Sequence, residues 1–320
     1  MAKKLTASSK PVSKSRDPHV VRLGLVQHAC GSDIAANLDT ATKLIADAAK
    51  QGADIVATQE LFASTYFCQI EDDRRFDLAE PIPGPRSQRL CELARKLRIY
   101  LTASLFEKRA PGLYHNTSIM IDPSGTIIGK YRKMHIPDDP RFYEKYYFTP
   151  GDSPAPGISS GRNSVNVCAG WQVHQTAKAT TGMLICWDQW YPEAARLTAL
   201  RGAQILFYPT AIGWFHKETP FDRKQQKEAW QIIQRSHAIA NGVFVAAINR
   251  VGVEEDLEFW GASYVIDPGG VIIAQASDTS EQVLIADCDM KRIEEIRRGW
   301  PFLRDRRVDA YGGITQRYGR

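Results

Sequence analysis

The order of apolar and amphipathic segments constrains this chain more than any other feature of its sequence. Residues 20–27 (VVRLGLVQ) form an apolar run typical of a buried strand, and residues 34–52 then carry apolar side chains at helical spacing up to Gly52, a plausible helix end. Residues 53–60 (ADIVATQE) predict a second strand. A strand, a helix and a strand in such close succession indicate a parallel crossover. The chain is therefore predicted to have an α/β fold.

The same order returns in the second half, where the sequence contains a weak internal repeat. Residues 51–62 (QGADIVATQELF) and 201–212 (RGAQILFYPTAI) both leave a helical segment, pass through Gly-Ala-x-Ile and continue as an apolar strand. Two related halves would each build a sheet. Hairpins are predicted around residues 122–125 and 267–270, which both contain Asp-Pro and Gly. We expect a four-layer αββα sandwich, in which two sheets pack face to face and helices cover the outside.

The charge of the chain is concentrated at its N-terminus. The formal net charge is +5, and residues 1–18 alone hold five basic residues and one acidic residue. This segment, rich in Ser and Lys, predicts a disordered basic tail. The remainder, residues 19–320, has no long Pro/Gly linker and predicts one domain. Because that domain is nearly neutral, binding to nucleic acid is not expected.

Several other classes of protein are disfavoured by what the sequence lacks. No later run approaches the roughly 18 apolar residues of a membrane span, and the basic tail lacks the apolar stretch of a signal peptide, so we expect a cytoplasmic protein without membrane contact. The six cysteines are far apart and form no CxxC pair. The seven histidines show no ligand spacing. We therefore expect no disulfide framework, metal or cofactor.

Three polar residues each follow an apolar run. They are Glu60 after residues 53–59, Lys133 just past residues 125–132, and Cys186 after residues 181–185. Loops at the carboxyl ends of parallel strands converge on one crevice, so the three side chains are candidates for a shared site. Taken singly, Glu60 could cap the following turn, Lys133 could be a surface cation, and Cys186 could be a buried packing residue.

Together, these three side chains supply the separate roles that acyl transfer needs. A thiolate such as that of Cys186 attacks a carbonyl carbon, a carboxylate carries the proton, and an ammonium stabilises the oxyanion. The backbone N–H of Trp187 is the candidate for a second oxyanion donor.

Longer motifs surround these residues and resemble a known family. The segments 56–62 (VATQELF), 130–152 (KYRKMHIPDDPRFYEKYYFTPGD) and 184–214 (LICWDQWYPEAARLTALRGAQILFYPTAIGW) resemble the carbon–nitrogen hydrolases of the nitrilase superfamily. The resemblance extends over nearly the whole chain after the tail. It implies an αββα sandwich that assembles as a homodimer or a higher homo-oligomer. It also implies roles for four residues: a base, a lysine, a nucleophile and a second glutamate that positions the lysine and the substrate, at Glu60, Lys133, Cys186 and Glu144.

The motifs at 185–196 (ICWDQWYPEAAR) and 206–214 (LFYPTAIGW) are most similar to the branch that hydrolyses N-carbamoylputrescine. This resemblance implies hydrolysis of that carbamoylated amine to putrescine, carbon dioxide and ammonia through a cysteine-bound thiocarbamate, a step in polyamine biosynthesis. A carbamoylated diamine carries an ammonium group at its far end, which carboxylates or aromatic faces can bind. Such groups are abundant around the motifs, and the candidates for substrate binding are Tyr66, Asp138, Asp139, Trp187, Asp188, Trp190, Trp214 and Glu218.

Alternatives remain open from the sequence. The chain could be a β-ureidopropionase or another N-carbamoyl-amino-acid or ω-amide hydrolase, for which an arginine facing the substrate tail is expected. A binding protein that has lost catalysis is disfavoured because the four family residues are intact. Asp188 could instead stabilise the following helix. The segment 215–226 differs from the corresponding loop of plant members, which leaves the role of Glu218 open, and residues 157–170 have no assigned role.

Overall fold

The computed structural model describes residues 17–152 and 170–319. Most of the predicted basic tail and of the segment 157–170 therefore lies outside the described residues. Among the described helices, none is long and apolar enough to cross a membrane.

The first sheet has six strands in the order β15-β1-β2-β3-β4-β5. Strands β1, β2 and β3 run parallel, and the other neighbours are antiparallel. Helices α1 (Ile34–Lys50) and α2 (Pro85–Leu97) make the two crossovers. The strands are β1 (Val20–Gln27), β2 (Ile55–Thr58), β3 (Tyr100–Ala110), β4 (Leu113–Ile121), β5 (Ile127–Arg132) and β15 (Gln282–Asp289).

The second sheet also has six strands, in the order β14-β13-β10-β8-β7-β6, and its three central strands β10, β8 and β7 are parallel. Helices α4 (Pro192–Leu200) and α5 (Pro220–Asn241) connect them. The strands are β6 (Val173–Gln175), β7 (Thr180–Met183), β8 (Ile205–Thr210), β10 (Phe244–Asn249), β13 (Tyr264–Ile266) and β14 (Ile272–Gln275). A small third sheet contains β9 (Gly213–Phe215), β11 (Val251–Glu254) and β12 (Leu257–Trp260).

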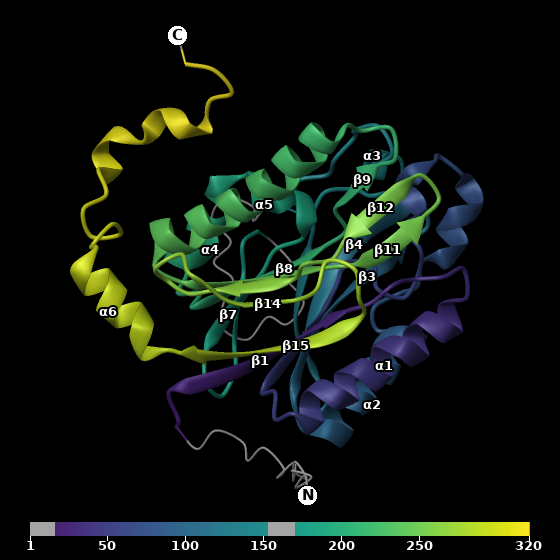
Figure 1. The fold of residues 1–320 in the computed structure, drawn as a ribbon, viewed down its shortest axis with the longest axis horizontal. Helices are drawn as coiled ribbons and strands as arrows, with labels where there is room; N and C mark the ends of the chain where they lie inside the picture. The colour runs from purple at the N-terminus through teal and green to yellow at the C-terminus, as the bar shows by residue number, and fades with distance from the viewer. Residues whose placement is uncertain (1–16, 153–169, 320) are drawn as a thin grey trace, which may run out of the picture.

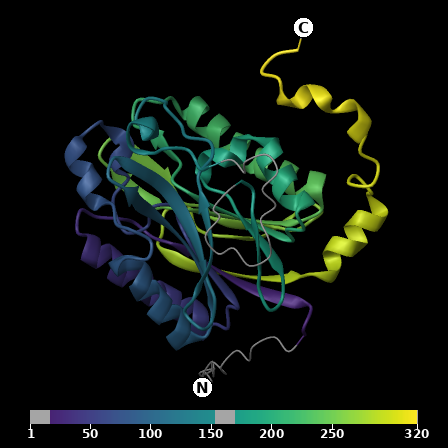
Figure 2. The ribbon, with the colours of Figure 1, turned by 180° about the vertical axis from the view of Figure 1, so that it is seen from behind.

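The two large sheets pack face to face, with α1 and α2 outside one and α4 and α5 outside the other (Figures 1 and 2). Successive side chains of a strand point to opposite faces, so one strand serves two layers. In β8, Ile205 and Phe207 pack between the sheets, whereas Leu206 and Tyr208 pack toward the outer helices. Burial on both faces explains why the central strands are continuously apolar. The predicted four-layer sandwich is therefore confirmed.

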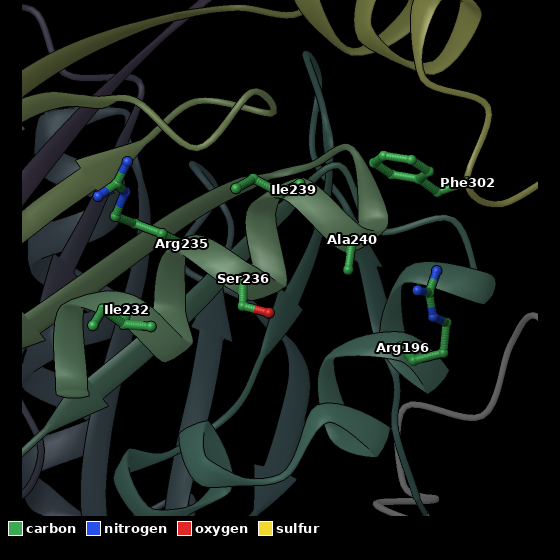
Figure 3. A pocket seen from close by; sticks show the side chains of 7 residues that line it. All are labelled: Arg196, Ile232, Arg235, Ser236, Ile239, Ala240 and Phe302. Atoms are coloured by element: carbon green, nitrogen blue, oxygen red, sulfur yellow. The ribbon is translucent and has the colours of Figure 1, made fainter.

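The C-terminal segment leaves this body. Helix α6 (Lys291–Gly299) is still held to the body by the buried Ile293 and by hydrogen bonds from Arg297 to the Asn241 carbonyl oxygen, whereas the residues after it stand away from the sandwich in both views (Figures 1 and 2). Side chains of this arm, such as Val308 and Ile314, are strongly exposed. A groove of about 560 Å³ lies between α4, α5 and Phe302 at the base of the arm (Figure 3).

The predicted crossovers and both hairpins are present, but the division into two halves is not exact. Strand β15 comes from the C-terminal part of the chain, yet it pairs with β1 over eight residues, from Val20 opposite Asp289 to Gln27 opposite Gln282. Without β15, β1 would be an edge strand with unpaired backbone groups. The last strand therefore completes the sheet of the first half.

Candidate active site

Three of the four residues implied by the family resemblance form one buried charge cluster. Glu60 follows β2, Lys133 follows β5, and Glu144 begins the short helix α3 (Glu144–Tyr147). The Nζ atom of Lys133 donates to Oε1 of Glu60 at 2.9 Å and to Oε2 of Glu144 at 2.7 Å. All three side chains are completely buried. The lysine therefore lies between two carboxylates, away from bulk water.

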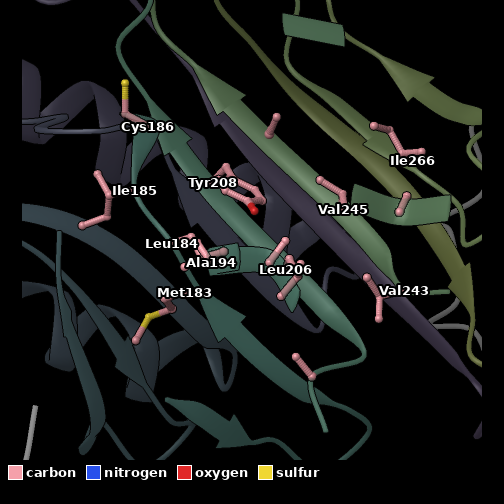
Figure 4. Close-up of a cluster of buried hydrophobic side chains, with 14 of the residues drawn as sticks. Met183, Leu184, Ile185, Cys186, Ala194, Leu206, Tyr208, Val243, Val245 and Ile266 are labelled. Atoms are coloured by element: carbon pink, nitrogen blue, oxygen red, sulfur yellow. The ribbon is translucent and has the colours of Figure 1, made fainter. Parts of the chain in front are cut away.

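Cys186 occupies a sharp turn beyond β7. It is the first residue of a short 3₁₀ helix, η3 (Cys186–Trp190), and its φ angle of 41° is in the left-handed region that non-glycine residues rarely adopt. Figure 4 shows Cys186 at the edge of an apolar cluster, with its sulfur directed away from the labelled apolar side chains. The Sγ atom lies 4.0 Å from the carbonyl oxygen of Ala211. The turn thus directs the Cys186 sulfur away from the apolar cluster.

The electrostatics of the cluster act on this thiol. Burial raises the pKa of Cys186 well above its usual value, the negative charge of Glu60 raises it further, and Lys133 opposes both. Burial alone would lower the pKa of Lys133, but Glu144 and Glu60 more than offset it, so the lysine stays charged. Burial raises the pKa of Glu144 to about 7 despite the attraction of Lys133. Cys186 is therefore a neutral thiol at rest and needs a base.

Glu60 has the free acceptor that a base requires. Its Oε1 atom accepts from Lys133 and, at 2.7 Å, from Nδ2 of Asn116. Its Oε2 atom is buried and has no hydrogen-bond partner among the described residues. Such an orphaned oxygen is costly to bury and is characteristic of a site awaiting a reacting group.

Two supporting residues were missed from the sequence. Asn116 on β4 holds Glu60, and Ser104 on β3 donates to Oδ1 of Asn116 at 3.0 Å and accepts from the Leu61 amide at 3.2 Å. The sequence signal is the polar run from His115 to Ser118 between apolar residues of the strand. A buried polar run of this kind requires internal hydrogen-bond partners.

A cavity of about 660 Å³ opens beside Cys186. Its wall contains Cys186, Trp187 and Trp190, together with the three carboxylates Asp139, Glu218 and Asp222. No lysine or arginine is found among the described residues that line it. The other lining residues are Pro137, Pro140, Phe142, Gln189, Ala211, Ile212, Gly213, Phe215, Gln225, Gln226 and Ala229.

Four residues proposed from the sequence to bind substrate do not line this cavity: Tyr66, Asp138, Asp188 and Trp214. Tyr66 is buried and donates its hydroxyl to Oε1 of Glu144 at 2.7 Å. Asp188 is fully buried, and its two oxygens accept from the backbone and ring of His135, the Ile185 amide and the Tyr131 hydroxyl. The polar groups of Tyr66 and Asp188 are already hydrogen-bonded within the protein. Their positions therefore suit them to hold neighbouring residues in place rather than to contact a substrate.

The described residues contain no group of three or more His, Cys, Asp or Glu side chains arranged to hold a metal ion. Five cysteines in the described ranges are free thiols, while Cys168 lies outside them.

Comparisons with known proteins bear on this geometry. The family model described as carbon-nitrogen hydrolase matches residues 22–298. The chain belongs to the carbon–nitrogen hydrolase family. An N-carbamoylputrescine amidase from Solanum lycopersicum is 40% identical over 301 residues, covering 91% of this chain and 94% of that protein. A citrullinase from Francisella tularensis is 39% identical, covering 93% and 99%. A carbon-nitrogen hydrolase from Helicobacter pylori G27 superposes with a TM-score of 0.86 at 43% identity, covering 94% of this chain and all of that chain.

Membership in the carbon–nitrogen hydrolase family makes this chain a hydrolase of carbon–nitrogen bonds with the nitrilase-superfamily fold, as the resemblance of its motifs implied. The four residues Glu60, Lys133, Glu144 and Cys186, hereafter the site tetrad, lie within the matched range. The tetrad is therefore the candidate active site of this hydrolase.

Proposed function

We propose that this hydrolase converts N-carbamoylputrescine into putrescine, carbon dioxide and ammonia, with the site tetrad as its catalytic group. The observation that supports this most directly is the cavity beside Cys186, whose described wall carries carboxylates and aromatic rings but no cation. A carbamoylated diamine has a neutral urea-like head for the thiol and a positively charged tail for such a wall. The similarity to N-carbamoylputrescine amidases supports the same assignment.

In the proposed first half-reaction, Oε2 of Glu60 takes the proton of the Cys186 thiol and the thiolate attacks the carbamoyl carbon. The Lys133 ammonium and the Trp187 backbone N–H stabilise the oxyanion. The carbon–nitrogen bond then breaks, the proton on Glu60 goes to the departing nitrogen, and ammonia leaves. A thiocarbamate remains on the sulfur.

In the second half-reaction, Glu60 removes a proton from a water molecule, which attacks the thiocarbamate carbon. The carbon–sulfur bond breaks, and the sulfur recovers its proton from Glu60. The product is a carbamic acid, which loses carbon dioxide to leave the free amine. Glu60 thus acts as base and acid in each half of the cycle.

Glu218 is the proposed anchor for the far ammonium group. It lines the cavity, and its Oε2 atom is buried without a hydrogen-bond partner among the described residues. An unpaired buried carboxylate oxygen gains most from a cation placed beside it. We expect Glu218→Gln to raise KM for N-carbamoylputrescine about tenfold with little change in kcat, because the lost contact is distant from the reacting carbon. An unchanged KM would remove Glu218 from the substrate site.

The proposed reaction is tested by ammonia release from N-carbamoylputrescine and from N-carbamoyl-β-alanine, with Cys186→Ala as the blank. We expect turnover of the first compound, at least about tenfold slower turnover of the second because the described cavity wall offers no cation to its carboxylate, and no activity in the variant. Preference for N-carbamoyl-β-alanine would instead favour a β-ureidopropionase or related amino-acid amidase. Citrulline, which carries both an ammonium and a carboxylate, belongs in the same assay because of the similarity to a citrullinase.

We also propose that the hydrolase works as a homodimer or a higher homo-oligomer in the cytoplasm. Large apolar side chains are exposed on α4, α5 and the C-terminal arm, including Leu200, Ile232 and Trp300. Surfaces of this kind mark contacts between protein chains. The molar mass in solution, measured by light scattering after size-exclusion chromatography, tests the proposal; a mass of one chain would contradict it.

A further inference from the structure

A buried arginine connects the site tetrad to the strands beneath it. Arg250 lies between β10 and β11, and its guanidinium is fully buried. Its Nη2 atom donates to the carbonyl oxygen of Glu60 at 2.9 Å and to that of Leu61 at 3.2 Å. Both Nη atoms reach the carbonyl oxygen of Ser64 at 3.3 Å. One side chain therefore holds three carbonyls of the turn that presents the Glu60 carboxylate, a turn in which Leu61 has a φ angle of 47°.

The charge partner of Arg250 connects to the other glutamate of the tetrad. Glu254 accepts from Nη1 of Arg250 at 2.7 Å and 3.0 Å, and its Oε2 atom accepts from the Tyr66 amide at 2.5 Å. The Tyr66 hydroxyl in turn donates to Glu144. The buried pair thus fixes the backbone of Glu60 directly and the position of Glu144 through Tyr66.

The residue before Arg250 connects the same junction to the nucleophile. Oδ1 of Asn249 accepts from the Ile212 amide at 3.0 Å, and its Nδ2 atom donates to the Ile212 carbonyl oxygen at 2.9 Å. Ile212 follows Ala211, whose carbonyl oxygen lies 4.0 Å from the Cys186 sulfur. Two adjacent residues therefore hold loops that belong to opposite sheets.

We propose that Arg250 and Glu254 form a positioning unit that sets the geometry of Glu60 and Glu144 relative to Lys133. This inference rests on the proposed thiol hydrolase chemistry. Two buried charges are expensive to desolvate, and an apolar pair of similar volume is often as stable, so stability alone explains the pair poorly. The donors of Arg250 instead bind the backbone of Glu60 and its neighbours. A displacement of about 1 Å in a catalytic group lowers the rate about 100-fold.

Glu254→Gln and Arg250→Lys test the inference, with Glu107→Gln as the matched control. The glutamine keeps the shape of Glu254 without its charge, and lysine keeps the charge of Arg250 without the planar fork. Glu107 also forms a buried pair, accepting from Arg132 at 2.7 Å and 2.8 Å, but it lies on β3 and binds Thr117 rather than the tetrad. Its loss should lower stability and leave the chemistry intact.

Two readouts are needed: ammonia release from N-carbamoylputrescine, and the pH dependence of Cys186 alkylation by iodoacetamide, followed on the Cys186 peptide by mass spectrometry. We expect kcat to fall about 10- to 100-fold in both test variants with KM within about threefold of wild type. The midpoint of the alkylation profile should shift by about one pH unit or more, because the charges facing the thiol have moved. Glu107→Gln should keep the wild-type values.

A wild-type alkylation profile in Glu254→Gln would overturn the inference, whatever happens to kcat. If Arg250→Lys does not fold, Glu254→Gln alone tests the positioning role of the pair. Alkylation needs no substrate, so failure of the wild-type protein to hydrolyse N-carbamoylputrescine would contradict the proposed function and leave this test in place.

Discussion

At the scale of single residues, the candidate site keeps the Cys186 thiol protonated at rest and places a base beside it that can form the thiolate during the reaction. Burial and the charge of Glu60 keep Cys186 protonated, although Lys133 is close enough to lower its pKa. A protonated thiol resists oxidation and unwanted alkylation. Glu60, with one oxygen held by Lys133 and Asn116 and the other unpaired among the described residues, is placed to remove the proton only when an electrophile arrives.

Glu144 should make stability depend on pH. Burial raises its pKa from 4.5 to about 7, so between these values the unfolded chain has released the proton while the folded chain retains it. Ionisation then favours the unfolded chain, and this contribution to stability falls as the pH rises from 4.5 to 7. We expect Glu144→Gln to unfold in urea with a free energy close to that of wild type at pH 5, and with a smaller decrease on going to pH 7.

Glu107→Gln is the control, because Glu107 should change the free energy of unfolding with pH in the opposite direction to Glu144. Burial would raise the pKa of Glu107, but hydrogen bonds from Arg132 and Thr117 outweigh it and the pKa is lowered. Stability from Glu107 is therefore present above its unfolded pKa and lost as the pH falls. Equal pH dependence of wild type and Glu144→Gln would contradict the account of Glu144.

Residues were predictable from sequence where they lie in contiguous motifs. Glu60, Lys133, Glu144 and Cys186 each stand within a recognisable run, and the structure brings the first three into direct contact. Their supports were not predictable. Arg250 contacts Glu60 across 190 positions of sequence through a backbone carbonyl, and a contact of this kind leaves no local pattern.

At the scale of elements, the turn at η3 depends on one carboxylate. Asp188 accepts from the Ile185 amide at 2.9 Å and the Tyr131 hydroxyl at 2.8 Å on one oxygen, and from His135 on the other. These bonds connect the chain on either side of Cys186 to residues on either side of Lys133. The left-handed φ of Cys186 is thereby supported from both ends.

Asp188→Asn should weaken this turn. The new amide group donates where the carboxylate accepted, so at least one buried donor loses its partner, at a cost of about 1–3 kcal/mol in the free energy of unfolding. We expect kcat to fall about tenfold as the thiol moves, with a smaller change in KM. Urea unfolding and steady-state ammonia release measure both effects. Asp122→Asn, in the exposed β4–β5 turn, is the control and should leave kcat unchanged.

Element types were predictable and some partners were not. Helical spacing in residues 34–52 and the apolar runs around it correctly indicated α1, β1 and β2, because burial on one stripe or on both faces leaves a clear pattern. The small sheet of β9, β11 and β12 was missed, since its strands have three or four residues each. The pairing of β15 with β1 joins opposite ends of the chain, and no periodicity reports such a contact.

At the scale of the whole molecule, a glycine of one sheet faces a histidine of the other. A Cβ atom on Gly129 of β5 would lie 2.1 Å from Cε1 of His174 on β6, far inside contact distance. His174 is buried, and burial lowers its pKa to about 4, so it packs as a neutral ring. The spacing between the sheets at this edge is therefore set by the absence of a side chain.

Gly129→Ala should force the sheets apart at this edge and lower the free energy of unfolding by about 1–3 kcal/mol, the usual cost of overpacking. Adding His174→Ala should recover part of that loss, giving a favourable coupling in a double-mutant cycle. Chemical denaturation of the four proteins measures the coupling. Gly299→Ala, where a Cβ would meet no atom within 4 Å, is the control. Strict additivity would show that the two sites do not touch in solution.

Part of the cavity wall comes from a stretch of chain that holds none of the site tetrad. Glu218 and Asp222 belong to the connection from β8 into α5, whereas Glu60, Lys133, Glu144 and Cys186 lie elsewhere. The four residues of the tetrad can therefore stay unchanged while substitutions in this short connection alter which compound the cavity accepts. A redesign of this enzyme for a different amide can therefore begin in the β8–α5 connection, where a substitution changes the cavity without touching the residues of the tetrad.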